Sequence, residues 1–239
     1  MASWVTHLMI ADRVLEEIPE LDRHGFCIGN IAPDCNVENE DWTQFVPSRE
    51  ITHWMSADRK TAADCERFYD AYIADGMFKS KSAQEQSFLL GYYAHLVADA
   101  EFQRCIRDPR RVAACWTRIK SHPILSARSH GMTENWDNAK KIIGTRNRMR
   151  DIHTMEAEYL GTHPSSGYLT EILELTDFPD YLNYLPTGAI VRKIGVMGYL
   201  PQKELENIRL SQLQGKNTPH SSTRQCSISF RASLADNSL

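Results

Sequence analysis

The stretch that decides the fold is residues 82–106, which read SAQEQSFLLGYYAHLVADAEFQRCI. Apolar and aromatic residues recur in it at helical spacing over about seven turns. Ser82 precedes the pattern, and a serine at this position can cap the first turn of a helix. Because the polar stripe is very narrow, a helix formed here must be covered by other elements on most sides. We therefore expect a long, largely buried helix over residues 82–106.

His95 and Asp99 lie four residues apart in this helix, so their side chains project from one face, one turn apart. An imidazole and a carboxylate at that spacing can bind one cation together. An unpaired carboxylate in such apolar surroundings is costly, and a metal ion or a charged partner removes the cost. The alternative is a His–Asp pair that only holds helices together, and the pair alone does not decide between the two.

Three further segments present metal-binding residue types. Asp34 ends the hexapeptide GNIAPD, in which Pro33 stiffens the approach to the carboxylate. His53 lies between a threonine and a tryptophan, and His7 lies near the start of the first expected helix. Each has a purely structural alternative: a turn or cap aspartate, a hydrogen-bonded core histidine, and a structural helix histidine. If the segments converge, the chain has a metal site.

The apolar spacing in the rest of the chain also predicts an all-α protein. We expect helices over residues 3–18, 57–75, 109–120, 133–159 (interrupted at Gly144) and 166–175. Residues 25–50 contain Gly29, Pro33 and Pro47 and predict a long ordered loop, whereas residues 189–200 fit either a helix or a strand. We expect a single helical domain over residues 1–205 and a polar, disordered tail over residues 206–239.

Composition limits the function classes. The 239 residues are 42% hydrophobic and 24% charged, with a formal net charge of −4 that gives no reason to expect a nucleic-acid partner. The sequence shows no signal peptide and no apolar run near 18 residues, so we expect a cytoplasmic protein with at most peripheral membrane contact. The six cysteines are scattered without a CxxC pair and read as reduced, and Cys35 beside Asp34 as a small buried hydrophobe.

Four motifs, taken in order, resemble the zinc-dependent phospholipase C family, whose superfamily also holds the S1/P1-type nucleases. They are Thr6-His7-Leu8, the hexapeptide ending at Asp34, Thr52-His53-Trp54, and Gly-Tyr-Tyr-Ala-His-Leu-Val-Ala-Asp ending at Asp99. The resemblance implies a mostly helical fold whose central cleft holds up to three zinc ions. It also implies that Asp34, His53, His95 and Asp99 form the central metal site. His7 would then bind a neighbouring ion and share Asp99.

The chain departs from the family pattern outside these motifs. Trp4 is internal here, whereas the secreted lipases of the family use an N-terminal tryptophan as a zinc ligand. No histidine follows Asp99 closely, and His122 and His130 are the next in the sequence. His153 and Glu156 lie three apart instead of four, and Asp151 and Glu158 are possible substitutes. We expect two zinc ions and leave a third open, with His153 and Glu156 as its candidate ligands.

The chemistry that follows is phosphoester hydrolysis of the phospholipase C kind. A zinc ion lowers the pKa of its bound water, and the resulting hydroxide attacks phosphorus while a second ion holds the phosphate oxygens. Asp34 is the expected catalytic residue, orienting or deprotonating the water. The expected substrate is a small phosphoester or a phospholipid head group. Two alternatives stay open: a non-catalytic, metal-stabilised helical protein and an S1/P1-type nuclease. The sequence does not indicate the oligomeric state.

Overall fold

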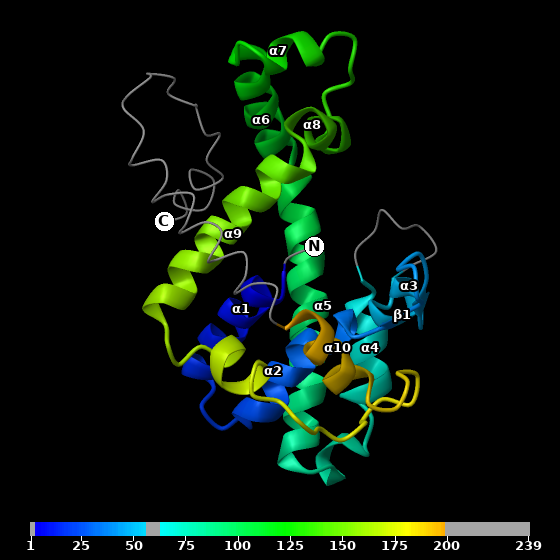
Figure 1. Ribbon diagram of the computed structural model, residues 1–239. Coiled ribbons are helices and arrows are strands. Elements are labelled where there is room, and N and C mark those ends of the chain that lie inside the picture. The colour runs from blue at the N-terminus through cyan, green and yellow to red at the C-terminus, as the bar shows by residue number, and fades with distance from the viewer. Residues whose placement is uncertain (1–2, 56–62, 199–239) are drawn as a thin grey trace. The chain divides into compact units, whose positions relative to one another are not determined.

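The structure is a computed structural model that describes residues 3–55 and 63–198 (Figure 1). Most of these residues are helical, which confirms the all-α prediction. The longest helices are α1 (Trp4–Glu17), α5 (Ala83–Ile106), α6 (Pro109–Ser121) and α9 (Thr145–Thr162). The shorter elements are α2 (Arg23–Ile31), η1 (Ala32–Asp34), β1 (Val37–Glu38), β2 (Phe45–Val46), α3 (Arg49–Thr52), α4 (Cys65–Tyr72), η2 (Phe78–Ser80), α7 (Leu125–Arg128), α8 (Trp136–Ile143), η3 (Tyr168–Ile172) and α10 (Ala189–Met197).

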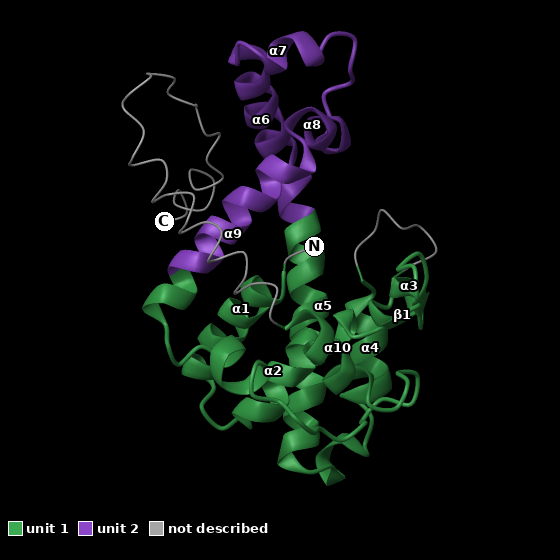
Figure 2. Cartoon of the chain, in the orientation of Figure 1, with its two compact units in different colours: residues 1–103, 159–201 green, residues 104–158, 202–239 purple. Residues whose placement is uncertain are grey.

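The chain divides into two compact units, coloured separately in Figure 2. The first comprises residues 1–103 and 159–201, and its contacts include α1 against α2, α2 against η3, and α3 against η1. The described part of the second is residues 104–158, in which α6, α7 and α8 pack on one another. In the described part of the chain, no helix combines the length and the apolar character that crossing a membrane requires.

Local sequence signals explain where several helices begin and end. The hydroxyl of Ser3 accepts a hydrogen bond from the amide of Thr6 and caps α1. Gly144 separates α8 from α9 with a φ of 82°, a conformation that suits a residue without Cβ. The expected helices over 82–106, 109–120 and 133–159 therefore match α5, α6 and the pair α8–α9. Residues 189–200, open between helix and strand, form α10 over their described part.

Two expected helices are met by the structure only in part, and two further expectations lie outside it. The helix expected over 57–75 is present as α4, while residues 56–62 lie outside the described residues. The helix expected over 166–175 is the short π-helical turn η3. The tail expected over 206–239 also lies outside the described residues, so it stays a prediction, as does the single-domain boundary at residue 205.

The long loop expected over residues 25–50 is wrong in its first part, which forms α2. Its glycines serve helix packing instead of turns. A Cβ on Gly29 would lie 2.0 Å from the carbonyl oxygen of Phe88, and one on Gly25 would lie 2.4 Å from that of Gln84. From the other helix, a Cβ on Gly91 would lie 2.1 Å from the carbonyl oxygen of Phe26. Glycine is required because the backbones of α2 and α5 nearly touch, and a single sequence cannot distinguish this use from a turn.

A two-stranded hairpin and α10 are joined by a buried ion pair. β1 and β2 pair antiparallel, with Val37 opposite Val46. The Lys193 ammonium donates to Glu38 Oε2 at 2.6 Å, and the Arg192 guanidinium lies 2.8 Å from Glu38 Oε1. Burial alone would raise the pKa of Glu38, but the hydrogen bond from Lys193 and the contact with Arg192 lower it to about 2. The hairpin, which connects Asp34 to α3, is thus tied to α10 within the first unit.

Candidate metal centre

Four separate segments of the first unit deliver the five residues expected at a metal site. His7 comes from α1, Asp34 ends η1, and His53 follows the last residue of α3. His95 and Asp99 lie one turn apart on α5. The three histidines are 1–2% exposed and Asp99 is 8% exposed, while the side chain of Asp34 is 18% exposed. The structure therefore brings together residues that are up to 92 positions apart in sequence (99 − 7).

The first group of candidate ligands is Asp34, His53 and His95, whose ligand atoms all lie within 4.8 Å of one another. His53 Nε2 lies 3.2 Å from Asp34 Oδ1 and 3.3 Å from His95 Nε2. Two ligand atoms bound at 2.0–2.1 Å to a tetrahedral zinc ion lie about 3.3–3.4 Å apart. The observed separations therefore suit a zinc ion.

The second group is His7, His95 and Asp99, again within 4.8 Å. His7 Nε2 lies 3.6 Å from Asp99 Oδ1, and the ring of His7 stacks on that of His95 with centroids 3.8 Å apart and planes 9° apart. Both ring nitrogens of His7, and Asp99 Oδ1, are buried without a hydrogen-bond partner among the described residues. Buried polar atoms are normally satisfied, so these atoms indicate a ligand.

The backbone of α2 fixes the orientation of His95. His95 Nδ1 lies 2.7 Å from the carbonyl oxygen of Asn30. Because a carbonyl oxygen only accepts, Nδ1 carries the proton and Nε2 presents its lone pair to the cluster. Burial lowers the pKa of His95 to about 3, and His7 acts in the same direction, so the ring is neutral near pH 7. The neutral form is the one that binds a metal.

His53 is held in a similar way. Its Nδ1 lies 3.0 Å from the hydroxyl oxygen of Thr52, and that hydroxyl also lies 3.4 Å from the carbonyl oxygen of Arg49. If the Thr52 hydroxyl donates to that carbonyl, it accepts from Nδ1 of His53, and Nε2 is left with a lone pair. The hydroxyl of Tyr92 donates to the carbonyl oxygen of Thr52 and so joins α3 to α5. Trp54 then adopts a φ of 49°, which turns the chain away directly after His53.

The arrangement fits a cation. When His53 carries its proton on Nδ1, the Nε2 lone pairs of His53 and His95 face each other at 3.3 Å beside an oxygen of Asp34, so three acceptors converge. Burial would raise the pKa of Asp34, but His53, His95 and Arg49 hold it well below its usual range. The pKa of Asp99 is also held low, against the effect of burial, by His7 and His95. Neutral imidazoles with ionised carboxylates are a donor set typical of zinc.

Arg49 is the cluster residue that sequence reasoning missed. Its Nη1 lies 3.2 Å from Asp34 Oδ1 and its Nη2 lies 3.0 Å from Asp99 Oδ2. The side chain is 30% exposed, more than any of the five candidate ligands. Asn30 and Tyr92 were also missed as supports, because each takes part in a contact between a side chain and a backbone carbonyl on different elements. Thr52 was missed although it directly precedes His53. The position of Arg49, four residues before His53, was the one signal available.

The two candidate ligands of a third ion lie in the second unit. His153 Nδ1 is 3.2 Å from Glu156 Oε2, one turn along α9, so the two side chains do share a helix face. Both candidate metal groups in the described residues consist of other residues. The role of His153 and Glu156 as ligands therefore stays a prediction.

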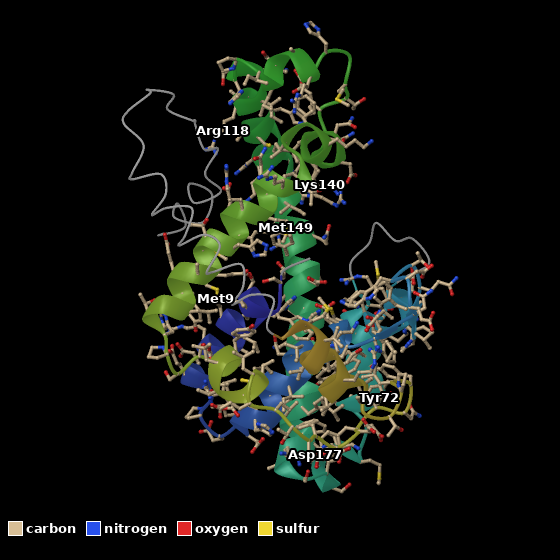
Figure 3. The ribbon with its side chains drawn as sticks, in the orientation of Figure 1. Met9, Tyr72, Arg118, Lys140, Met149 and Asp177 are labelled. Atoms are coloured by element: carbon tan, nitrogen blue, oxygen red, sulfur yellow. The ribbon has the colours of Figure 1, made fainter. Side chains whose placement is uncertain are left out.

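A buried cysteine and a pocket lie close to the candidate ligands in sequence. The Cys35 thiol is buried and lies 3.4 Å from the carbonyl oxygen of Ile31, so it packs next to Asp34 without joining either candidate group. On α3, Glu50 and Ile51 line a pocket with Trp54, Met55, Arg67 and Tyr184. Tyr72, labelled in Figure 3, packs edge-on against the Trp54 ring at 5.9 Å between centroids.

Comparison with known proteins identifies the same region. Residues 6–101 match the family model described as zinc dependent phospholipase C. The matched segment contains all five clustered residues and confirms the resemblance that the four motifs suggested. No curated protein and no solved structure matches the chain.

Proposed function

From the family match over residues 6–101, we propose that this chain is a zinc-dependent hydrolase of phosphoester bonds. The observation that supports the proposal most strongly is the pair of facing Nε2 atoms of His53 and His95, 3.3 Å apart beside Asp34 Oδ1. A cation bound at this position would accept a lone pair from each of these three atoms.

We assign two ions of unequal affinity. His95 belongs to both candidate groups, but its Nδ1 is engaged by Asn30, so only Nε2 is available to a metal. When His95 joins Asp34 and His53, that ion has three protein ligands and an open position, as in catalytic zinc sites. The neighbouring ion then has His7 and Asp99 as its protein ligands and is held more weakly.

Zinc bound there would supply a water of lowered pKa and positive charge to hold phosphate oxygens. Asp34 is the residue we assign to orient or deprotonate that water. Its contacts with His53 and Arg49 both use Oδ1, and its 18% exposed side chain is the most accessible carboxylate of the cluster. His53, His95 and Arg49 keep Asp34 ionised by lowering its pKa, so its carboxylate can accept a hydrogen bond from that water, and a lowered pKa favours orienting the water over taking its proton.

The substrate class we favour is a small phosphoester, free or as a phospholipid head group. The net charge of −4 disfavours a nuclease, because nucleic-acid binding depends on basic surface that neutralises phosphates. A metal-stabilised protein without catalysis is the second candidate. It requires an ion with four protein ligands and no open position, whereas the first group offers three.

Activity of the metal-stripped and zinc-reloaded protein tests the proposal. The substrates are a soluble phosphodiester, a phosphomonoester and phosphatidylcholine vesicles. We expect hydrolysis of a phosphoester that is lost on chelation, regained with zinc and abolished in Asp34→Asn. Asp41→Asn, in the exposed hairpin turn, is the matched control and keeps full activity. Zinc binding without hydrolysis of any of the three substrates would favour the non-catalytic candidate.

A further inference from the structure

We propose that Arg49 exchanges partners when metal binds: it bridges Asp34 and Asp99 in the metal-free protein and binds the phosphate of the substrate in the zinc-loaded protein. The inference rests on the proposed function, because it names how this chain would bind the phosphate at that site. Its basis is the position of one guanidinium between carboxylates that belong to different candidate metal groups.

The geometry makes Arg49 a substitute for the metal charge. One fork nitrogen contacts Asp34 Oδ1 at 3.2 Å and the other contacts Asp99 Oδ2 at 3.0 Å. Asp34 Oδ1 is also the oxygen 3.2 Å from His53 Nε2, so the guanidinium and an ion in the first group would share one oxygen atom. Metal binding at that oxygen therefore weakens or breaks the contact with Arg49.

The charge balance points in the same direction. With neutral histidines, two carboxylates and one guanidinium sum to a single negative charge, so Arg49 is well compensated in the metal-free cluster. Two zinc ions add four positive charges, which leaves the same cluster with three positive charges. A guanidinium in those surroundings is repelled unless an anion is present. A phosphate group supplies that anion.

Arg49 is also built and placed to reach such an anion. Its side chain is 30% exposed, whereas the histidines beside it are 1–2% exposed. Arg49 is therefore the most solvent-accessible side chain of the cluster. A planar guanidinium binds two oxygens of one phosphate as readily as it binds carboxylate oxygens, which a lysine ammonium cannot do. The α3 backbone holds Arg49 in register with His53, since the amide of His53 donates to the carbonyl oxygen of Arg49 at 2.8 Å.

Two binding constants test the exchange, zinc affinity and the affinity of the zinc-loaded protein for inorganic phosphate. The variants are Arg49→Gln, Arg49→Lys and the control Arg13→Gln, whose arginine is exposed on α1 and pairs with Glu16 and Glu17. Chelator competition gives the first constant, and calorimetric titration gives the second. In Arg49→Gln we expect zinc to bind more tightly by about tenfold, and phosphate to bind about 10- to 100-fold more weakly. Arg49→Lys keeps the charge without the fork and falls between, while the control matches the wild type.

The outcomes separate this proposal from the function on which it rests. Weaker zinc binding in Arg49→Gln would overturn the exchange, because Arg49 would then orient the carboxylates for the metal. Unchanged phosphate affinity would overturn it as well, while hydrolysis by the wild type would leave the proposed function standing. A wild type that binds no zinc would overturn both. KM in Arg49→Gln for a soluble phosphodiester and for phosphatidylcholine vesicles identifies the source of the phosphate, since it rises for the one used.

Discussion

At the scale of single residues, His95 is the position on which both candidate metal groups depend. His7 belongs to only one of them. We expect His95→Ala to lose the tighter ion in a calorimetric zinc titration, because His95 is a ligand of that ion, and His7→Ala to lose the weaker ion while it keeps the tighter one. His24→Ala is the control, because His24 lies in the same unit and pairs with Glu171. Loss of both ions in His7→Ala would contradict the assignment of unequal sites.

The sequence predicts the clustered ligands better than their supports. The four-residue spacing of His95 and Asp99 is readable directly, since helix geometry alone puts them on one face. The contact of His95 with Asn30 is not readable, because it joins a side chain on α5 to a backbone carbonyl on α2. Arg49 is also invisible as a partner, since an isolated arginine in a sequence gives no indication of which carboxylates it meets.

At the scale of elements, the close approach of α2 and α5 carries the site. Gly29 immediately precedes Asn30, so a side chain at 29 forces α2 away from α5 at the carbonyl that orients His95. We expect Gly29→Ala to lower the free energy of unfolding by about 1–3 kcal/mol and to weaken zinc binding. Urea denaturation and zinc titration measure the two effects.

A second glycine provides the matched control. Gly195 lies in α10, is exposed and has no atom within 4 Å of the position that a Cβ would take. Gly195→Ala should raise the free energy of unfolding by about 0.5–1 kcal/mol, because alanine loses less backbone entropy in a helix. Equal effects of the two substitutions would show that the helices do not need glycine for their contact.

The same glycines explain why the sequence predicts α5 correctly and α2 wrongly. The pattern of α5 is long and apolar, so one glycine at 91 does not obscure it. The nine residues of α2 carry two glycines and are followed closely by Pro33, which is the composition of a turn. Only the position of the partner helix shows that these glycines are contact points.

The ion pair between Glu38 and Lys193 is the other element-level link. We expect Glu38→Gln and Lys193→Met each to lower the free energy of unfolding by about 3–5 kcal/mol, because each leaves a buried charge without its main partner. The double substitution should recover part of that loss. A double-mutant cycle in urea measures the coupling, and additive single effects would contradict it.

The coupling should depend on pH with a defined sign. The pKa of Glu38 is about 2 in the folded protein, below its ordinary value of 4.5. A carboxyl with a lowered pKa contributes its stability above pH 4.5, and this contribution is lost as the pH falls towards 2. The cycle repeated between these values should show the coupling declining, and a constant coupling would contradict the ion pair.

At the scale of the whole molecule, the metal should stabilise the first unit, since all five clustered residues belong to it. A ligand present at 100 times its Kd stabilises the folded state by about 2.7 kcal/mol. For a protein of this size we therefore expect chelation to lower Tm by about 5–10 °C. Asp34→Asn should show a much smaller shift, and an equal shift in both proteins would place the stabilising ion elsewhere.

The sequence predicts the helical class and the order of most helices, because hydrophobic periodicity is a local property. It does not predict the division into two units, which depends on contacts between residues far apart in the chain. His153 and Glu156 illustrate the difference. Their spacing on α9 can be read from the sequence, but only tertiary structure assigns them to the second unit, whereas the five residues of the cluster belong to the first.

The most direct test of the central claim is an anomalous difference map, recorded at the zinc edge from crystals of the zinc-loaded protein. We expect a strong peak among Asp34, His53 and His95, and a weaker peak between His7 and Asp99. We also expect that the Arg49 guanidinium no longer contacts Asp34 Oδ1. A map without a peak at these residues, in crystals that hold zinc elsewhere, would contradict the assignment of these residues as zinc ligands.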